Sequence, residues 1–207
     1  MPCSLLLLTV PCSLSMLAPW RSPLKSATHR NRSKPHSRYF QLATITPDGY
    51  PRNRTVVFRG FLNDDTNRLK IITDARSAKI QDIEHQSVAE ICWYFTKTRE
   101  QFRILGTLQL VTARETDPNL QKARQITWHN LSDSARSQFA WPDPARRAAD
   151  KSAFDVEPPD PNAPLNNFCL LLLAPTKIDH LQLKSDPQQR FLYTQEDNTW
   201  KTQAVNP

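Results

Sequence analysis

Two short segments of this chain carry side chains that together could bind a phosphate group. Residues 54–59 (RTVVFR) place a cation at each end of an apolar run whose alternate side chains share a face. In residues 74–79 (DARSAK), Ser77 and Lys79 precede the helical pattern IQDIEHQ, and Thr73 lies just before the segment. Hydroxyls, an ammonium, guanidinium groups and free N–H groups at a helix start are the donors that a phosphate dianion requires. The pattern therefore predicts an anion site where two strands meet a helix.

The same cations have a simpler interpretation. Arg and Lys beside a hairpin commonly form a solvated edge that discourages strand-to-strand aggregation. The loop at residues 62–68 (LNDDTNR) has the Asp/Asn chemistry of a hairpin turn, so strands at 54–59 and 69–73 are expected to pair with one another. Asp74 or Ser77 is expected to cap the helix that follows. The choice between a solvated edge and an anion site depends on the rest of the chain.

Composition limits the classes of protein to consider. The chain has 207 residues with a formal net charge of +7, and its five Trp and nine Phe favour one folded domain over disorder. The three glycines, Gly49, Gly60 and Gly106, cannot form a GxGxxG or GxxxxGK phosphate loop. The four cysteines show no metal-ligand spacing, so no metal site is predicted. Cys92 and Cys169 lie in apolar runs as buried hydrophobes, which favours a reducing, cytoplasmic location.

The N-terminal region divides into two parts. Residues 1–15 (MPCSLLLLTVPCSLS) lack a basic start and are too short to span a bilayer, so we interpret them as a leader or an alternative-start extension. Residues 16–207 are then expected to form a single domain. No other segment has the length and apolarity of a membrane span.

Residues 17–38 carry six Arg and Lys without one acid. Trp20, Leu24 and Ala27 fall near helical spacing, which predicts a short amphipathic helix packed on its own domain. The alternative is a basic arm that contacts nucleic acid or a membrane surface. No aromatic residue is interleaved with the cations after this helix, as stacking on bases would require, so nucleic acid is the less favoured partner.

The remaining pattern is mostly β. Apolar and alternating runs bounded by turn residues predict an antiparallel barrel with helices on its outside, and a bend is expected near Gly106. We expect strands at residues 39–45, 54–59, 69–73, 87–95, 101–112, 167–174, 177–183, 190–194 and 198–203, and helices at residues 117–128 and 134–139.

Five motifs in one order carry a resemblance to a known family. RTVVFR, ITD-x-x-S-x-K, EQFRILG, SQFAW and a terminal RFLY-(x)5-WK hairpin resemble the pyridoxamine 5'-phosphate oxidase superfamily of FMN-binding split β-barrels. The resemblance covers residues 16–207 and is closer to the stand-alone oxidase-like branch than to the true oxidase. It implies a homodimer with FMN at the subunit interface and an FMN-dependent oxidoreductase, oxidase or reductase, acting on a small molecule.

The resemblance also implies roles for individual residues. In the family, the flavin carries the redox chemistry, and a residue like Gln101 comes from the partner subunit. Ser137, Gln138 and Trp141 are candidates for the substrate pocket. The FMN-binding positions implied are Arg54, Thr55, Val56, Val57, Phe58, Arg59, Thr73, Ser77, Lys79, Gln101 and Arg190.

Departures from the family pattern bear on the substrate. Asp186 and Gln188 stand where the true oxidases carry an arginine and a histidine that bind the phosphate of pyridoxal phosphate, and an aspartate would repel that phosphate. Pro144, Ala145 and Arg146 replace an expected Gln-Ser pair. We therefore keep FMN as the cofactor and expect a substrate other than pyridoxamine phosphate.

Three hypotheses remain open. The first is an FMN-dependent oxidoreductase with a small-molecule substrate, in which His129 and His180 are the candidates for proton handling. The second is an FMN-binding carrier or electron-transfer protein with little turnover. The third is a basic barrel that binds nucleic acid through residues 17–38.

Overall fold

An antiparallel sheet of eight strands dominates the part of the chain that the computed structural model describes, residues 17–207. The leader predicted at residues 1–15, with Met16, Cys3 and Cys12, lies outside these described residues. In chain order the elements are α1 (Arg21–Asn31), η1 (Pro35–Arg38), β1 (Tyr39–Ile45), β2 (Pro51–Val57), β3 (Leu69–Asp74), α2 (Lys79–His85), β4 (Val88–Phe95), β5 (Glu100–Val111), α3 (Pro118–His129), α4 (Asp133–Ser137), η2 (Lys151–Phe154), β6 (Phe168–Gln182), β7 (Gln189–Glu196) and β8 (Thr199–Val205).

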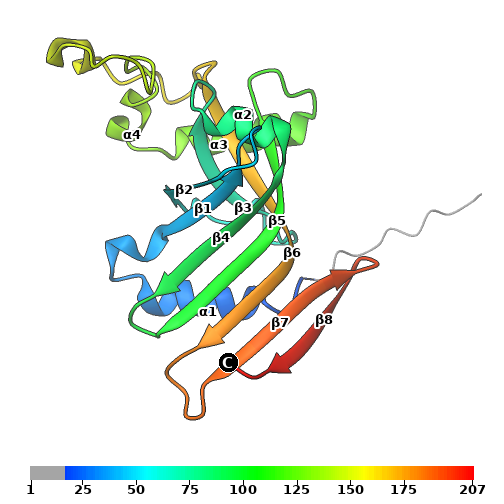
Figure 1. Cartoon of the computed structure of the whole chain (residues 1–207). Helices are drawn as coiled ribbons and strands as arrows, with labels where there is room; N and C mark the ends of the chain where they lie inside the picture. Colours follow the sequence, from blue (N-terminus) through cyan, green and yellow to red (C-terminus); the bar gives the residue numbers. More distant parts are fainter. Residues whose placement is uncertain (1–16) are drawn as a thin grey trace, which may run out of the picture.

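The sheet is organised around the long strand β6. The strand order is β2-β1-β4-β5-β6-β7-β8, and β3 pairs with the first half of β6 on the side away from β5. The second half of β6 pairs with β7. After β2, the backbone N–H of Arg59 donates to Lys70 (2.9 Å) and that of Lys70 donates to Gly60 (2.8 Å). These bonds join the end of β2 to β3 and bring the two edges of this part of the sheet together. Figure 1 shows the β7–β8 hairpin at one end and α4 with its following segment at the opposite end.

Two strand predictions were wrong in part. The hairpin expected between residues 54–59 and 69–73 forms only next to its loop, where residues 59–61 pair with Lys70 and Leu69, because β2 pairs with β1 along its whole length and β3 pairs with β6. Alternate side chains of β3 are buried against the core, so burial beside an apolar neighbour outweighs the local turn chemistry. The expected strands 167–174 and 177–183 form one strand. It continues through Pro175 because the facing strand β5 shifts register between Leu105 and Gly106.

The register shift lies at Gly106, the position where the sequence predicted a bend. A side chain at position 106 would place its Cβ 2.3 Å from the carbonyl oxygen of Ala174. Only glycine lets the two strands approach so closely at this point.

Helix α1 packs on the barrel, as its apolar spacing predicted. Trp20, Leu24 and Ala27 are fully buried, and the ring of Trp20 lies 5.9 Å from that of Trp200 in β8. Arg21 is buried as well, and its guanidinium donates to the carbonyl of Asn63 at 2.9 Å. Among the described residues, no helix combines the length and apolarity needed to cross a membrane.

Candidate functional site

A cavity of about 770 Å³, here called the large cavity, opens where β2 and β3 meet the segment that follows α4. Both segments singled out for phosphate chemistry contribute to its wall, and α4 with its following segment supplies the opposite side. The sequence-predicted residues that line it are Arg54, Thr55, Val56, Val57, Arg59, Thr73, Ser77, Lys79, Gln138 and Trp141.

Lys79 lies at the start of α2 and faces β3. Its ammonium donates to Ser77 Oγ at 2.6 Å and to Thr73 Oγ1 at 3.0 Å. Burial lowers the pKa of Lys79, and the positive charge of Arg54 lowers it further. Within residues 17–207 its hydrogen-bond partners are hydroxyls and no carboxylate binds it directly. The ammonium is therefore fixed in position while its charge remains available to an anion.

Arg54 projects from β2 and is held by the strand beside it and by α2. Its guanidinium donates to Thr44 Oγ1 (2.6 Å), to the carbonyl of Leu42 (3.1 Å) and to Asp82 Oδ2 (3.3 Å). The Asp82 side chain is completely buried, and it also accepts a hydrogen bond from the hydroxyl of Thr44. Burial lowers the pKa of Arg54, and Asp82 opposes this effect. The arrangement fixes the guanidinium at the junction of sheet and helix.

The predicted helix cap was wrong. Ala78 occupies the N-cap position of α2, and no side chain caps it. Asp74 instead accepts the backbone N–H of Arg76 at 2.7 Å, which closes the turn before the helix. This local bond between an Asp and the residue two positions later competes with helix capping.

Arg76 is a site residue that the sequence analysis missed. Its guanidinium pairs with Asp74 at 2.7 Å and Asp143 at 2.9 Å, and donates to the carbonyls of Phe139 and Trp141 at 3.1 and 3.0 Å. Hydrogen bonding to Asp74 raises the pKa of Arg76. Arg76 thus fastens the segment after α4 to the end of β3 and forms one rim of the large cavity. An Asp-x-Arg pair before a helix was the available sequence signal, but its partners beyond residue 138 could not be inferred.

Two donors in the cavity wall lack acceptors. Arg59 Nε and Trp141 Nε1 are buried and have no hydrogen-bond partner within residues 17–207. The Trp141 ring packs edge-on against that of Phe154 at 5.6 Å. Because an unpaired buried N–H is costly, these groups are suited to donate to a bound molecule.

Other predicted site residues lie away from the large cavity. The Phe58 ring packs in the core, 4.9 Å from the ring of Trp93. Gln101 lies on β5, where it accepts a weak hydrogen bond from the Cys92 thiol at 3.9 Å. Arg190 lies on β7 and pairs with Asp179 through two bonds of 2.7 and 2.9 Å.

The polar candidates from the helical region also lie outside the wall. The Ser137 hydroxyl donates to the carbonyl of Asp133 at 3.0 Å, within α4. His180 is fully buried, 3.0 Å from Glu100, and stacks on Phe102 at 4.0 Å. His129 is exposed at the end of α3 and does not line the large cavity. Neither histidine is therefore placed to exchange a proton with a molecule in that cavity.

Comparisons with known proteins identify the family of this chain. A family model described as the FMN-binding domain of pyridoxamine 5'-phosphate oxidase matches residues 17–112. Pyridoxine/pyridoxamine 5'-phosphate oxidase 2 of Arabidopsis thaliana is 38% identical over 196 residues, which covers 92% of this chain and 98% of the relative. The chain belongs to the pyridoxamine 5'-phosphate oxidase family.

Solved structures of this family and fold extend the comparison. A pyridoxamine 5'-phosphate oxidase-related, FMN binding protein from Nostoc punctiforme is 52% identical, with a TM-score of 0.89, over 93% of this chain and 100% of that one. PhzG from Burkholderia lata has a TM-score of 0.72 at 20% identity, over 90% and 91% of the two chains, and shares the fold. The mostly β split barrel with peripheral helices, expected from the sequence, is confirmed.

FMN is the cofactor of this oxidase-family chain, since both the matching domain and the Nostoc structure are FMN-binding. The large cavity fits such a group on its own chemistry. FMN carries a phosphate dianion and a flat ring with carbonyl oxygens and ring nitrogens. The wall offers the Lys79 ammonium together with the unpaired donors Arg59 Nε and Trp141 Nε1.

Proposed function

We propose that this chain is an FMN-dependent oxidoreductase whose large cavity holds the flavin and a small-molecule substrate. The observation that carries the proposal is the Lys79 ammonium, held by Thr73 and Ser77 at the cavity wall with no carboxylate bound to it within residues 17–207. In this assignment Arg54, Thr73, Ser77 and Lys79 bind the FMN phosphate. Each supplies a fixed donor, so little ordering is required when the dianion arrives.

The other wall residues would orient the flavin and shield it. Thr55, Val56 and Val57 follow Arg54 along β2 and offer an edge against which a flat ring can lie. Trp141 and Gln138 face them from the segment at and after α4. Bound FMN supplies the redox chemistry by accepting a hydride or electrons. Nearby cations such as Arg59 favour negative charge on the reduced ring, and the Trp141 ring limits access of water.

A homodimer accounts for the predicted residues that lie elsewhere. Gln101 and Arg190 are on β5 and β7, outside the large cavity of their own chain. In the proposed dimer these side chains would complete the cavity of the partner subunit. The support for this arrangement is the family resemblance together with the position of both residues outside the large cavity of their own chain.

The substrate is proposed to be a compound other than pyridoxamine phosphate. Asp186 and Gln188 lie exposed in the connection between β6 and β7, where the family's phosphate-binding arginine and histidine would stand. The Arabidopsis relative is named for pyridoxine and pyridoxamine 5'-phosphate, which makes these the first compounds to test. The second candidate function is an FMN carrier with little turnover. The same cavity and the same departures from the family pattern, at Asp186 and Gln188, support it equally.

The FMN assignment is tested by Lys79→Met. We expect this variant to weaken FMN binding by about 1.5–3 kcal/mol, roughly 10- to 150-fold, the scale of hydrogen bonds to charged groups. Quenching of flavin fluorescence during titration of the FMN-free protein measures the affinity. Lys97→Met, at an exposed turn outside the cavity, is the matched control. Equal affinity in the two variants would remove the proposed phosphate cradle.

Turnover separates the two candidate functions. The FMN-loaded protein is mixed anaerobically with candidate reductants, and bleaching of the flavin absorbance followed by recovery in air indicates an oxidase. Rapid bleaching by pyridoxamine phosphate would overturn the substrate proposal and leave the FMN assignment intact. A flavin that no reducing metabolite bleaches would favour the carrier.

A further inference from the structure

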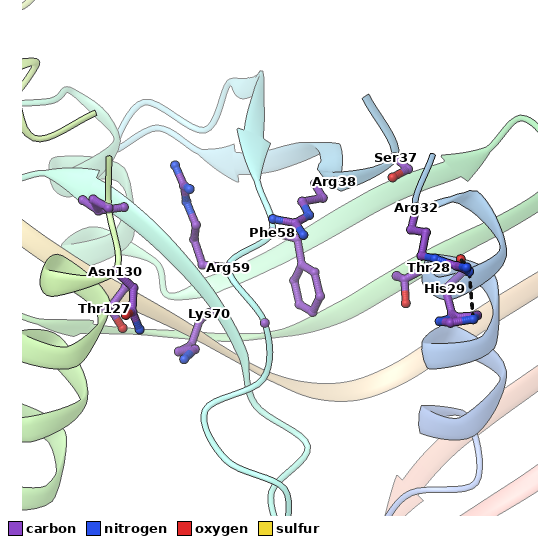
Figure 2. A pocket seen from close by; sticks show the side chains of 12 residues that line it. Thr28, His29, Arg32, Ser37, Arg38, Phe58, Arg59, Lys70, Thr127 and Asn130 are labelled. Atoms are coloured by element: carbon purple, nitrogen blue, oxygen red, sulfur yellow. Dashed lines mark hydrogen bonds between the residues drawn. The ribbon is translucent and has the colours of Figure 1, made fainter. Parts of the chain in front are cut away.

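A second cavity, of about 510 Å³ and here called the small cavity, lies beside the first. It is bounded by α1 and η1 on one side, by the chain after β2 in the middle, and by the end of α3 on the other side (Figure 2). Arg59 lines both cavities. Arg32, Arg38 and Lys70 also line the small cavity, and none of its twelve lining residues is acidic.

The central cations of this cavity are not neutralised by the chain. Lys70 is half-buried, and burial alone lowers its pKa. Burial also lowers the pKa of Arg59, and the charge of Arg38 lowers it further. Within residues 17–207 the side chains of Arg38 and Lys70 make no hydrogen bond or ion pair, and Arg59 Nε has no partner. Lys70 and Arg59 are partly removed from water without a counterion, which carries an unfavourable free energy that a bound anion would offset. Arg38 is exposed and adds a further unpaired positive charge.

The cations occupy different parts of the cavity. In Figure 2 the side chains of Arg59 and Lys70 point away from one another, and Arg38 lies on the far side of Arg59 from α3. In this view the Phe58 ring lies below Arg38 and between Lys70 and α1, and Asn130 faces Lys70 from the end of α3. Widely spaced cations around an aromatic surface suit a ligand that carries negative charge at more than one end. A single compact ion would contact only one of them.

We propose that the small cavity binds a small organic polyanion, a phosphate ester or polycarboxylate, through Arg38 and Lys70, with Arg59 contributing at the boundary with the large cavity. This site goes beyond the proposed function, because neither Arg38 nor Lys70 lines the large cavity. The ligand would lie beside the flavin cavity and share one arginine with it. Its binding and that of FMN can therefore be measured separately.

The test titrates inorganic pyrophosphate, and citrate as a polycarboxylate, into the FMN-loaded protein by calorimetry at constant ionic strength. We expect saturable binding of at least one probe to the wild type. Lys70→Met and Arg38→Met are each expected to weaken it at least 10-fold, while the FMN content stays unchanged by absorbance. Lys122→Met, which removes an exposed cation from α3 outside the cavity, should bind like the wild type.

Several results would overturn the proposal. One is that neither pyrophosphate nor citrate binds the wild type saturably. Another is that Lys122→Met weakens binding as much as Lys70→Met does, which would indicate non-specific attraction to positive charge. A third contrary result is that Lys70→Met leaves pyrophosphate binding unchanged but shifts the monomer–dimer equilibrium in sedimentation. Lys70 would then pair with a carboxylate of a second copy of the chain and not with a small polyanion. Arg38 is exposed, so Arg38→Met provides an answer even if the Lys70 variant fails to fold.

Discussion

In the large cavity Arg54 and Arg76 each contact a carboxylate, whereas in the small cavity Arg38 and Lys70 contact none within residues 17–207. Arg59 lines both cavities, so the two arrangements lie side by side in one molecule. A cation paired within its own chain is held in place whether or not a ligand is present. Lys70 is unpaired and half-buried, so it loses hydration without compensation, and a bound anion would offset that loss. Arg38 is unpaired but exposed, so its charge is free to attract an anion at no such cost.

The comparison distinguishes two tasks within the large cavity as well. Arg76 is fastened to Asp74, Asp143 and two backbone carbonyls, so it holds the wall together. Lys79 is held by neutral hydroxyls, and within residues 17–207 no carboxylate binds its ammonium directly. Arg76, paired with two acids, therefore acts as a positioning cation, and Lys79, bonded to hydroxyls, acts as a binding one. Arg54 combines both tasks, because it pairs with Asp82 and still lines the cavity wall where the FMN phosphate is proposed to bind.

The largest expected effect comes from converting a paired cation into an unpaired one. Asp82→Asn removes the buried charge that faces Arg54 while keeping the shape of the side chain. We expect a loss of about 3 kcal/mol in the free energy of unfolding, near the lower end of the range for a broken buried ion pair because Arg54 retains some contact with water. Urea denaturation at a fixed FMN concentration measures the loss.

Glu84→Gln is the matched control for this variant. Glu84 is an exposed acid on the same helix, and the substitution makes the same change of charge. We expect a change within about 0.5 kcal/mol for such a surface position. Equal effects of the two substitutions would show that the Arg54–Asp82 contact has no special importance and would break the comparison drawn above.

The sequence predicted the parts of the fold and site that depend on contiguous residues. The alternation in residues 39–45 matches β1, and the terminal hairpin turns at Asp197 and Asn198, both with positive φ, as expected from their turn chemistry. The donors proposed for a phosphate fall in two short segments, so the order of residues along the chain was enough to predict that they lie together, and both segments line the large cavity. The pattern could not specify which strands pair. β3 pairs with β6, nearly a hundred residues later in the chain, and not along its length with its sequence neighbour β2.

The site residues that the sequence analysis did not predict have partners that are distant in sequence. Asp82 has an ordinary place in a helical pattern, and its role follows from its contacts with Arg52, Arg54 and Thr44, which are distant in sequence. The small cavity combines α1, η1, the chain after β2 and the end of α3. Its lack of acids is a property of that combination and is invisible in any one segment.

An intermediate effect is expected from Asp74, and it depends on pH. Burial by itself would raise the pKa of Asp74, but hydrogen bonds from Arg76 and Asn167 outweigh burial and lower it below the ordinary 3.8. Since the folded-state pKa lies below the unfolded one, the stabilisation is complete above the unfolded value and is lost as pH falls through it toward the folded value.

Asp74→Asn is therefore expected to lower the free energy of unfolding by about 2 kcal/mol at neutral pH, as for hydrogen bonds to a charged group. Urea denaturation between pH 7 and the acid range measures this loss. The free energy of unfolding of the wild type should approach that of the variant below roughly pH 4, the usual range of an Asp pKa. A difference that stays constant over this range would mean that Arg76 does not depend on the charge of Asp74.

The smallest effect should come from the outer partner of Arg76. The Asp143 side chain is 59% exposed, so its contact with Arg76 is screened by water although the two groups lie 2.9 Å apart. We expect Asp143→Asn to change the free energy of unfolding by less than about 1 kcal/mol, because exposed ion pairs contribute little. The same variant should loosen the segment after α4, since Asp143 is the only carboxylate beyond Phe139 that Arg76 binds within residues 17–207. Limited proteolysis between residues 143 and 166 measures this loosening. Faster cleavage with nearly unchanged stability would show that the Arg76–Asp143 contact holds the cavity wall. Unchanged cleavage would assign that task to the bonds from Arg76 to the carbonyls of Phe139 and Trp141.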